Sequence, residues 1–496
     1  MILRSVEALV AGIAPGQLVA IPPDYSGVSM AATRALLAAG HRGLRLVAVP
    51  TSGLQADLLV GAGRVDELEA AAISLGEAGP APRFTDAIKA GRIRMRDTTC
   101  PAVHAALQAA EKGIPFMPLR GLIGSDILAH RGDWKLASNP FAQGEDPIVF
   151  LPAIAPDVAL FHAPRADREG NVWIGRRREL ATMAHAARHA LVTVEEIVDG
   201  SLLEREDVAA GVLPAMYVGG VALAPRGAWP LGCQDLYDAD DAELLRYAAG
   251  AGRMSAEAAA RREAMLAAIL RRLEGCRTIA VGASSPLPGT AALLARAKWG
   301  ARVLMLGSRR HNSFTEGGRE LFDFAAQGRL DAFFLSGGQI DGQANINLLG
   351  IGAYPGGLRQ RFPGSFGSAY LYFLVPRVIL FREEHEPRTM PARVDVVSAP
   401  GVSPPGIFRP GGPVALVTGR CAFGFDRARG RFALESVHAG ETAAGVRAAT
   451  GFDYDSGQGA ATTPGLDDED RALIRERVAG EIAETYPRFA ATLLAA

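Results

Sequence analysis

Short apolar runs alternate with alanine-rich stretches along most of this 496-residue chain, and glycine or proline separates them. Continuous apolar runs of this length are typical of strands buried on both faces of a parallel sheet. The stretches between them keep helical spacing and end in glycine, as in 30–40 and 100–113. The pattern predicts an α/β fold with mostly parallel sheets covered by helices. The expected strands lie at 44–53, 146–154, 190–198, 277–285, 301–308, 331–338 and 377–385.

A charged segment without proline divides the chain. Residues 236–275 are rich in helix formers, unlike the glycine- and proline-rich sequence on either side. At about 150 residues per domain, the length suggests two to four domains. We therefore expect two tandem open α/β domains, 1–245 and 276–496, joined by a helical connecting segment at 246–275.

The charge balance and the cysteines exclude several classes of protein. The 52 basic and 53 acidic side chains give a net charge of -1, which argues against nucleic-acid and anionic-membrane partners. The four cysteines form no CxxC pair, so neither a zinc knuckle nor a disulfide scaffold is expected. The first residues lack a signal-peptide apolar region, and no run reaches the ~18 apolar residues that span a bilayer. We expect a soluble, cytoplasmic protein.

Five segments at expected strand–helix junctions are rich in glycine and serine. Glycine allows backbone N–H groups to approach a ligand closely, although each segment taken alone is equally consistent with a tight turn. None matches the phosphate-binding GxxxxGK[ST] or the GxGxxG pattern. Together they predict a site built from several loops at a sheet edge. The segments are 52–63, 74–84, 119–126, 335–347 and 363–370.

Two groups of carboxylates and one group of arginines are candidates for chemistry. Glu316 precedes two glycines in a polar loop after a strand, where a carboxylate can act as nucleophile or general base or can simply be exposed. The Glu383–His385 cluster ends another expected strand and is a rival. Three arginines, Arg176 to Arg178, either bind an anionic cofactor or form a solvated face.

Three other patterns are weaker. Cys100 is a possible nucleophile, but the sequence places no base near it. Ser125 with Asp126 and His130 lacks the GxSxG elbow of a hydrolase. His185 and His189 have helical metal-ligand spacing but no third ligand.

Several of these segments, in this order, resemble a family I CoA-transferase whose α and β subunits are joined head to tail. The first half is similar to the α subunit in DREGNVWIGRRRE (167–179), followed by ALVTVEEIVDG (190–200). The second half is similar to the β subunit. Its matching stretches are 336–347, 363–370, 377–385, 434–440 and 449–455. Within the family, the chain resembles the glutaconate-CoA-transferase-like proteins more than the 3-oxoacid group.

The resemblance implies a ping-pong reaction in which a glutamate of the β half attacks a CoA thioester and carries CoA to a carboxylic acid. Thr-Glu-Gly-Gly at 315–318 is the counterpart here, which makes Glu316 the expected nucleophile. Acyl-CoA and carboxylic acid are then the substrates, with no metal and no permanently bound cofactor, and the chain is expected to form a homodimer or homotetramer. The expected CoA-binding residues are Gly337, Gly338, Gln339, Gly367, Ser368 and Ala369. The expected acyl-pocket residues are Ser52, Gly53, Ser74, Arg120 and Ser125.

Two alternatives stay open on the same scaffold. One is a hydrolase that breaks a C–C or thioester bond of an acyl-CoA: family members without that glutamate are CoA-thioester ring-cleaving hydrolases that use a carboxylate of the α half, and the matching stretch 94–101 holds Asp97. A non-catalytic acyl-CoA-binding protein is the other alternative. Glu316 facing the CoA channel would favour transfer, whereas Asp97 and Cys100 facing it, with Glu316 outside, would favour hydrolysis. Arg120 suggests a dicarboxylic or otherwise polar acyl group.

Overall fold

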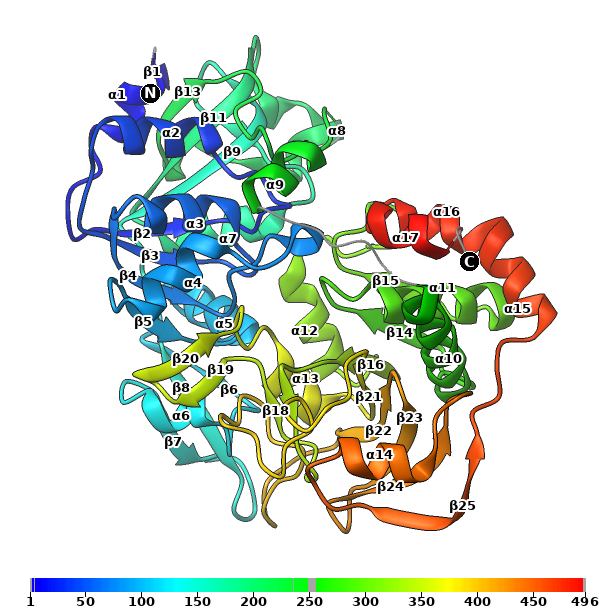
Figure 1. Cartoon of the computed structure of the whole chain (residues 1–496). Helices are drawn as coiled ribbons and strands as arrows, with labels where there is room; N and C mark the ends of the chain where they lie inside the picture. The colour runs from blue at the N-terminus through cyan, green and yellow to red at the C-terminus, as the bar shows by residue number, and fades with distance from the viewer. Residues whose placement is uncertain (1, 4, 235, 249–255, 494–496) are drawn as a thin grey trace.

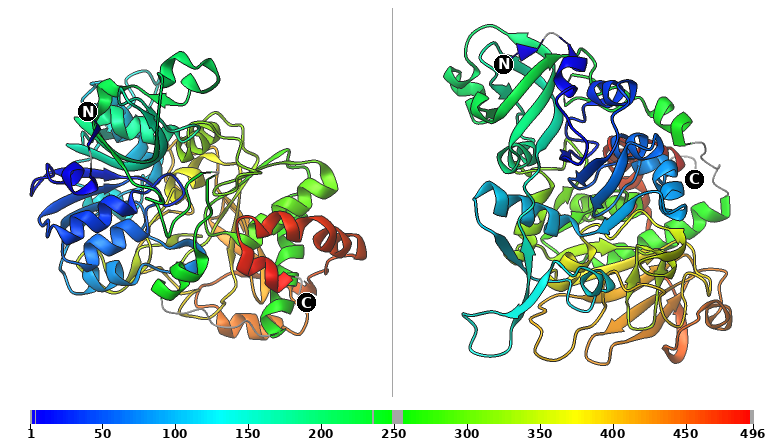
Figure 2. Two further views of the ribbon diagram at one scale, coloured as in Figure 1. Left: turned by 90° about the horizontal axis from the view of Figure 1, so that it is seen from above. Right: turned by 90° about the vertical axis from the view of Figure 1, so that its left-hand side faces the viewer.

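The computed structural model describes residues 2–3, 5–234, 236–248 and 256–493, which form two lobes (Figures 1 and 2). A ten-stranded sheet organises the first lobe, with the order β1-β13-β11-β9-β2-β3-β4-β5 and parallel pairing along that path. Two short strands, β10 and β12, pair antiparallel beside it. The strands are β1 (Ile2–Leu3), β2 (Leu18–Ile21), β3 (Leu44–Ala48), β4 (Val65–Ala70), β5 (Arg94–Asp97), β9 (Val158–Asp167), β10 (Val172–Trp173), β11 (His189–Val198), β12 (Val212–Leu213) and β13 (Val218–Leu223).

Helices cover both faces of this sheet. Alternate residues of β2 belong to different buried clusters: Val19 and Ile21 pack with one set of helices and Ala20 with the other. The first set includes Leu36 and Leu59, and the second includes Val103. The helices of this half are α1 (Val6–Val10), α2 (Met30–Ala38), α3 (Leu54–Gly61), α4 (Pro82–Lys89), α5 (Cys100–Glu111), α6 (Asp126–His130), α7 (Arg178–Ala186), α8 (Glu206–Ala209) and α9 (Asp241–Ala248).

The second lobe contains an eight-stranded sheet with the order β15-β14-β16-β21-β22-β23-β24-β25. Pairing is parallel from β15 to β22, antiparallel from β22 to β24, and parallel again to β25. Its strands are β14 (Thr278–Val281), β15 (Arg302–Met305), β16 (Ala332–Leu335), β21 (Arg377–Arg382), β22 (Pro413–Thr418), β23 (Cys421–Asp426), β24 (Arg431–Val437) and β25 (Asp455–Thr462). The predicted α/β class, with two large and mostly parallel sheets, is confirmed.

Four short strands and eight helices complete the described part of the second half. The strands form two hairpins outside the main sheet, β17 (Gln339–Ile340) with β18 (Ile346–Asn347) and β19 (Gly350–Ala353) with β20 (Gly357–Arg361). The helices are α10 (Ala256–Arg272), α11 (Pro286–Trp299), α12 (Gly318–Ala326), α13 (Ser368–Leu374), α14 (Ala443–Ala449), α15 (Asp468–Leu473), α16 (Ala479–Ala483) and α17 (Pro487–Leu493).

One expected strand lies in a different sheet from the one predicted. The run at 146–154 forms β8 (Pro147–Pro152), which pairs antiparallel with β6 (Phe116–Leu119) and β7 (Lys135–Ser138) in a separate three-stranded sheet. Only Val149 and Leu151 of β8 are fully buried. An uninterrupted apolar run therefore does not distinguish a half-exposed antiparallel strand from a buried parallel one.

The two sheets draw their strands from separate parts of the chain, up to Leu223 and from Thr278 onward. Helices α9 and α10 lie in the sequence between them, and 249–255 of the expected connecting segment falls outside the described residues. The boundaries 1–245, 246–275 and 276–496 stay a prediction that this segregation supports. Among the described helices, none is both long and apolar enough to cross a membrane.

A buried apolar cluster joins the two halves. It contains Ala71 and Leu122 of the first half together with Phe322 and Tyr370 of the second. Figure 1 shows α12, which carries Phe322, between the elements of the first half and the second sheet. Burial of apolar surface across this contact is the main stabilising contribution to the joint.

An ion pair is buried in the same joint. Both oxygens of Asp97, at the end of β5, accept hydrogen bonds from the guanidinium of Arg361 in β20, with Nη1 3.0 Å from Oδ2. The side chains are 5% and 2% exposed, respectively. The Tyr354 hydroxyl donates a third hydrogen bond to Asp97, at 3.1 Å.

Removing one partner of this pair should destabilise the protein strongly. Arg361→Met leaves the Asp97 carboxylate buried without its cation, and we expect a loss of about 3–5 kcal/mol in the free energy of unfolding. Urea denaturation measures it. Arg359→Met removes an exposed arginine two residues away and is the control. Equal stability of the two variants would contradict a stabilising role of the buried pair.

Candidate active site

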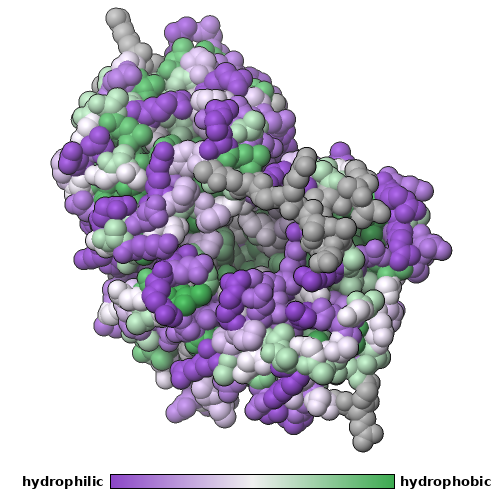
Figure 3. All heavy atoms as spheres, viewed as in Figure 1, coloured by the Kyte–Doolittle hydropathy of each residue, from purple (hydrophilic) through white to green (hydrophobic). Residues whose placement is uncertain are grey.

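A cavity of about 860 Å³ lies where the two halves meet. The carboxyl ends of three parallel strands form part of its wall, since Gly282 follows β14, Leu306 follows β15 and Leu335 ends β16. Open α/β sheets bind ligands at this edge. The face drawn in Figure 3 is hollowed near its centre, between the two lobes.

This cavity runs from a charged rim to a buried end. Lys89 of α4 and Arg359 of β20 line it and are exposed, whereas Cys100, Gly367 and Ser368 line it and are buried. A ligand that carries phosphates at one end and a reactive group at the other fits such an arrangement, because exposed cations bind phosphates while a buried end excludes water.

A second cavity, of about 640 Å³, adjoins the first. Its other walls come from the Asp24–Tyr25 turn, Arg177 and the C-terminal helices around Tyr486. We call the first cavity the long chamber and the second the side chamber. The residues that line both chambers are Thr51, Ser74, Gly76, Ala283, Ser284, Leu306 and Phe366.

The loop 363–367 of the second half carries Phe366, which lines both chambers, and hydrogen bonds attach the loop to the first half. The Ile73 N–H donates to the Pro363 carbonyl at 3.0 Å, and the Cys100 N–H donates to the Phe366 carbonyl at 2.9 Å. The Ser365 hydroxyl donates to the Thr98 carbonyl at 2.6 Å. Phe366 has φ +51°, a left-handed backbone conformation unusual for a side chain of this size. These contacts hold its ring at the junction of the chambers.

Asp24 is one of the carboxylates that line the side chamber, and its N–H donates to the carbonyl of Thr51 at the junction. It follows β2, and its two oxygens accept hydrogen bonds from the N–H groups of Gly53 and Leu54, both at 2.9 Å. Burial raises the pKa of Asp24 to about 7 despite these two bonds. A side chain at Gly53 would come within 2.5 Å of the Asp24 carboxylate, so glycine is required there. Asp24 was not among the residues predicted from sequence.

The predicted first-half residues are only partly brought together. Ser74 lines both chambers. The Ser52 hydroxyl is buried and donates to the Pro22 carbonyl at 2.8 Å, so it holds the backbone beside the junction. Gly53 donates to Asp24, as above. Of the five, only Ser74 lines a chamber: Arg120 pairs with Asp146, and Ser125 caps α6.

Only some of the predicted CoA-binding residues line a chamber. Gly367 and Ser368 line the long chamber. Ala369 is buried inside α13, and Gly337 and Gly338 face neighbouring side chains of their own half, where a Cβ atom would meet Ile346 and Phe362. The Gln339 side chain accepts hydrogen bonds from the Asn347 side chain and the Asp395 N–H, which is a structural arrangement. Four of these six residues therefore do not line either chamber.

Glu316 does not line either chamber. Its carboxylate is 2.7 Å from Arg319 and 3.6 Å from Arg178, and its side chain is 38% exposed. The residues that directly follow β15 are Leu306, Gly307 and Ser308, and the Ser308 hydroxyl donates to Glu484 at 2.6 Å. The strand end that faces the junction thus carries no carboxylate, and Glu316 lies farther along the chain, at the entry to α12.

The surroundings of Asp97 and Cys100 do not favour the alternatives based on these two residues. Asp97 is bound on both oxygens by Arg361 and does not line either chamber. Cys100 lines the long chamber, but burial raises the pKa of its thiol, which disfavours the reactive thiolate. Neither arrangement supports the group as a base or nucleophile.

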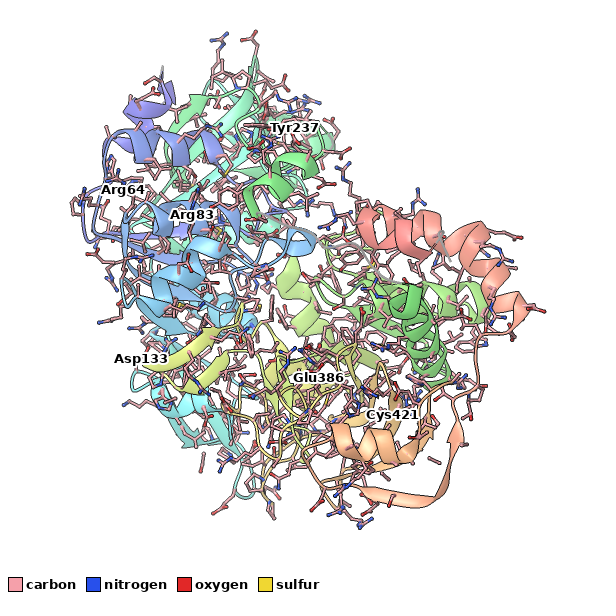
Figure 4. The ribbon with its side chains drawn as sticks, in the orientation of Figure 1. Arg64, Arg83, Asp133, Tyr237, Glu386 and Cys421 are labelled. Atoms are coloured by element: carbon pink, nitrogen blue, oxygen red, sulfur yellow. The ribbon has the colours of Figure 1, made fainter. Side chains whose placement is uncertain are left out.

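The Glu383–His385 cluster is also structural. Glu383 pairs with Arg262, Glu384 pairs with Arg382, and His385 lies buried between two threonine hydroxyls with its pKa lowered to about 4 by burial. In Figure 4 the next residue, Glu386, lies over the second half near Cys421, apart from Arg83 and Tyr237 of the first half.

Comparisons with known proteins identify the family. A model of the coenzyme A transferase family matches residues 3–224. The chain is 32% identical to one subunit of the glutaconate CoA-transferase of Acidaminococcus fermentans, over 38% of its own length and 64% of that subunit. It is 31% identical to one subunit of the 3-oxoadipate CoA-transferase of Pseudomonas knackmussii, over 47% of this chain and 83% of that subunit. The match to the first of these relatives thus spans less than two thirds of its length.

Two further matches extend the comparison. The chain is 31% identical to the cholesterol ring-cleaving hydrolase IpdA subunit of Rhodococcus jostii, over 45% of this chain and 77% of that subunit. The crystal structure of the acyl-CoA transferase YdiF from Escherichia coli O157:H7 superimposes with a TM-score of 0.69 and 16% identity, over 96% of both chains, which shows a common fold along the whole chain. This chain therefore belongs to family I of the coenzyme A transferases.

Proposed function

We propose that this chain binds an acyl-CoA thioester in the long chamber and transfers its CoA to a carboxylic acid held in the side chamber. The observation that carries the proposal is the pair of adjoining chambers, because CoA and the acyl group or acid that exchanges on it need two binding spaces that meet at one reacting centre. Lys89 and Arg359 at the rim suit the phosphates of CoA. The pantetheine arm then leads to the junction at Ser74 and Phe366.

Asp24, rather than Glu316, is the carboxylate we assign to the reaction. It lines the side chamber beside the junction, whereas Glu316 lies outside both chambers in ion pairs with Arg319 and Arg178. A carboxylate with a pKa near 7 is both largely ionised under mildly alkaline conditions and basic enough to be a good nucleophile.

In the proposed transfer, an Asp24 oxygen attacks the thioester carbonyl carbon, the C–S bond breaks, and CoA leaves as the thiolate. The thiolate then attacks the Asp24 carbonyl carbon of the resulting mixed anhydride, which releases the first acid and leaves CoA as an aspartyl thioester. A second acid takes up CoA by the same two steps in reverse. The N–H groups of Gly53 and Leu54 hold the carboxylate in place.

Hydrolysis of the thioester is the second candidate, favoured by one observation. The strand end after β15 has no carboxylate, and a general base with a pKa near 7 suits the activation of water. Asp24 would then take a proton from water as the water oxygen attacks the thioester carbon and the CoA thiolate leaves. The ring-cleaving hydrolase relative shares the scaffold of the first half.

Assembly of this chain into a homodimer or homotetramer stays a prediction.

Substitution of the two carboxylates separates the assignments. Asp24→Asn should lower kcat by about 100-fold or more, because the reacting carboxylate is removed. Glu316→Gln should keep nearly full kcat and cost less than about 1 kcal/mol of stability, because it weakens only partly exposed ion pairs. Steady-state assays with a series of acyl-CoAs measure both, with circular dichroism to check folding. The reverse result would assign the reaction to Glu316.

The pH dependence has a definite sign. Only the ionised carboxylate reacts, so kcat/KM of the wild type should rise with pH and level off above about 7, where Asp24 is deprotonated. The residual activity of Asp24→Asn should lack this step. A wild-type profile that is flat between about pH 5 and 9 would contradict a role for Asp24 in either reaction.

Isotope labelling distinguishes transfer from hydrolysis. With acyl-CoA in ¹⁸O-labelled water and an unlabelled acceptor acid, transfer gives new acyl-CoA and an unlabelled product acid, whereas hydrolysis gives free CoA and a labelled product acid. Borohydride reduction during transfer should trap the aspartyl thioester at Asp24, and peptide mass spectrometry locates it. Labelled acid with no adduct would replace the first candidate by the second.

A further inference from the structure

Arg177 lies in the side chamber with donors that no group of the described residues uses. Its buried Nε has no hydrogen-bond partner, and its charge acts on the buried carboxylate of Glu179 without an ion-pair contact among the described residues. The Arg177 side chain contacts the ring of Tyr25, with 6.0 Å from the guanidinium carbon to the ring centroid. A half-buried charge without a partner is costly, and such groups usually have a ligand.

Three carboxylates on the same wall are already bound. Glu484 accepts hydrogen bonds from the Ser308 hydroxyl and the Arg309 N–H, at 2.6 and 2.5 Å. Glu77 accepts from the backbone of the C-terminal helix, and Asp238 pairs with Arg309. Arg177 is thus a cation of the chamber that is left to bind an incoming anion.

We infer that Arg177 binds a second, non-reacting carboxylate, so that the side chamber selects acyl groups and acids with a carboxylate at the far end. The inference rests on the proposed function. Arg177 lines the side chamber but not the long chamber. The thioester, in contrast, must lie at the residues common to both chambers, such as Ser74 and Phe366. The planar guanidinium offers two parallel N–H donors that match a carboxylate.

Arg120, the arginine that the sequence suggested for this role, is already engaged. Both of its terminal nitrogens donate to the two oxygens of Asp146, and its guanidinium lies 4.5 Å over the ring of Phe408. It does not line either chamber. Of these two arginines, only Arg177 lies where it can contact a group bound in the side chamber.

The test uses unreactive thioether analogues, so that binding is measured without turnover. S-carboxyalkyl-CoA compounds with three, four or five methylene groups are compared with S-alkyl-CoA compounds of equal length by isothermal titration calorimetry. We expect the best carboxyalkyl analogue to bind the wild type at least tenfold more tightly than its alkyl counterpart. Arg177→Met should remove that preference without weakening the alkyl analogue, and Arg177→Lys should retain part of it.

Arg120→Met is the matched control and should keep the full preference. A preference that survives in Arg177→Met, or is absent in the wild type at every chain length, would overturn the assignment of Arg177. Failure of the proposed CoA site looks different, because CoA itself and the alkyl analogues would then bind neither the wild type nor the variants. The two proposals therefore fail separately.

Discussion

The backbone hydrogen bonds that attach loop 363–367 to the first half hold the whole site together. This loop belongs to the second half, yet its carbonyl and amide groups pair with Ala71, Ile73 and Cys100 of the first. Backbone groups in a buried joint must find partners, so a shift of one half relative to the other would leave several of them unpaired. The loop is thereby held in place, and with it Phe366, which lines both chambers.

The distribution of charge around the junction of the two chambers follows from the same joint. Asp97 and Arg361 form an ion pair inside the joint. Asp97 is the carboxylate that the sequence offered as the alternative reacting group, and this ion pair occupies it. Glu316 and Arg319 lie at the outer side of the joint, with Arg178 of the first half. The side chamber holds Asp24, whose pKa burial raises to about 7, and Arg177. These are the two residues to which we assign the roles of reacting carboxylate and substrate anchor in the proposed function.

Local patterning predicted the fold well and the site in part. Apolar runs such as 331–338 gave buried strands where expected, because burial on both faces leaves a direct trace in the sequence. The sequence also pointed to loop 363–370 and Ser74, because glycine and serine mark close approaches at strand ends, and residues of both line the long chamber. Asp24 was missed, although a polar residue after the apolar run LVAI and two prolines is the same kind of signal as at other strand ends.

Two other predicted residues have side chains suited to a site but are already hydrogen-bonded. Gln339 bonds with Asn347 and Asp395, and Arg120 bonds with Asp146, which are partners not adjacent in sequence. Glu316 was selected by the glycines that follow it, and Gly317 is in fact required because a side chain there would overlap Glu179, so that glycine reflects packing between the halves rather than a ligand.

A crystal structure of the full chain with an S-alkyl-CoA thioether would test the central claim most directly. The account predicts the phosphates beside Lys89 and Arg359, the pantetheine arm along the long chamber, and the thioether sulfur at Ser74 and Phe366 with the alkyl group directed toward Asp24. A complex with the sulfur beside Glu316, or with CoA bound outside the long chamber, would contradict it.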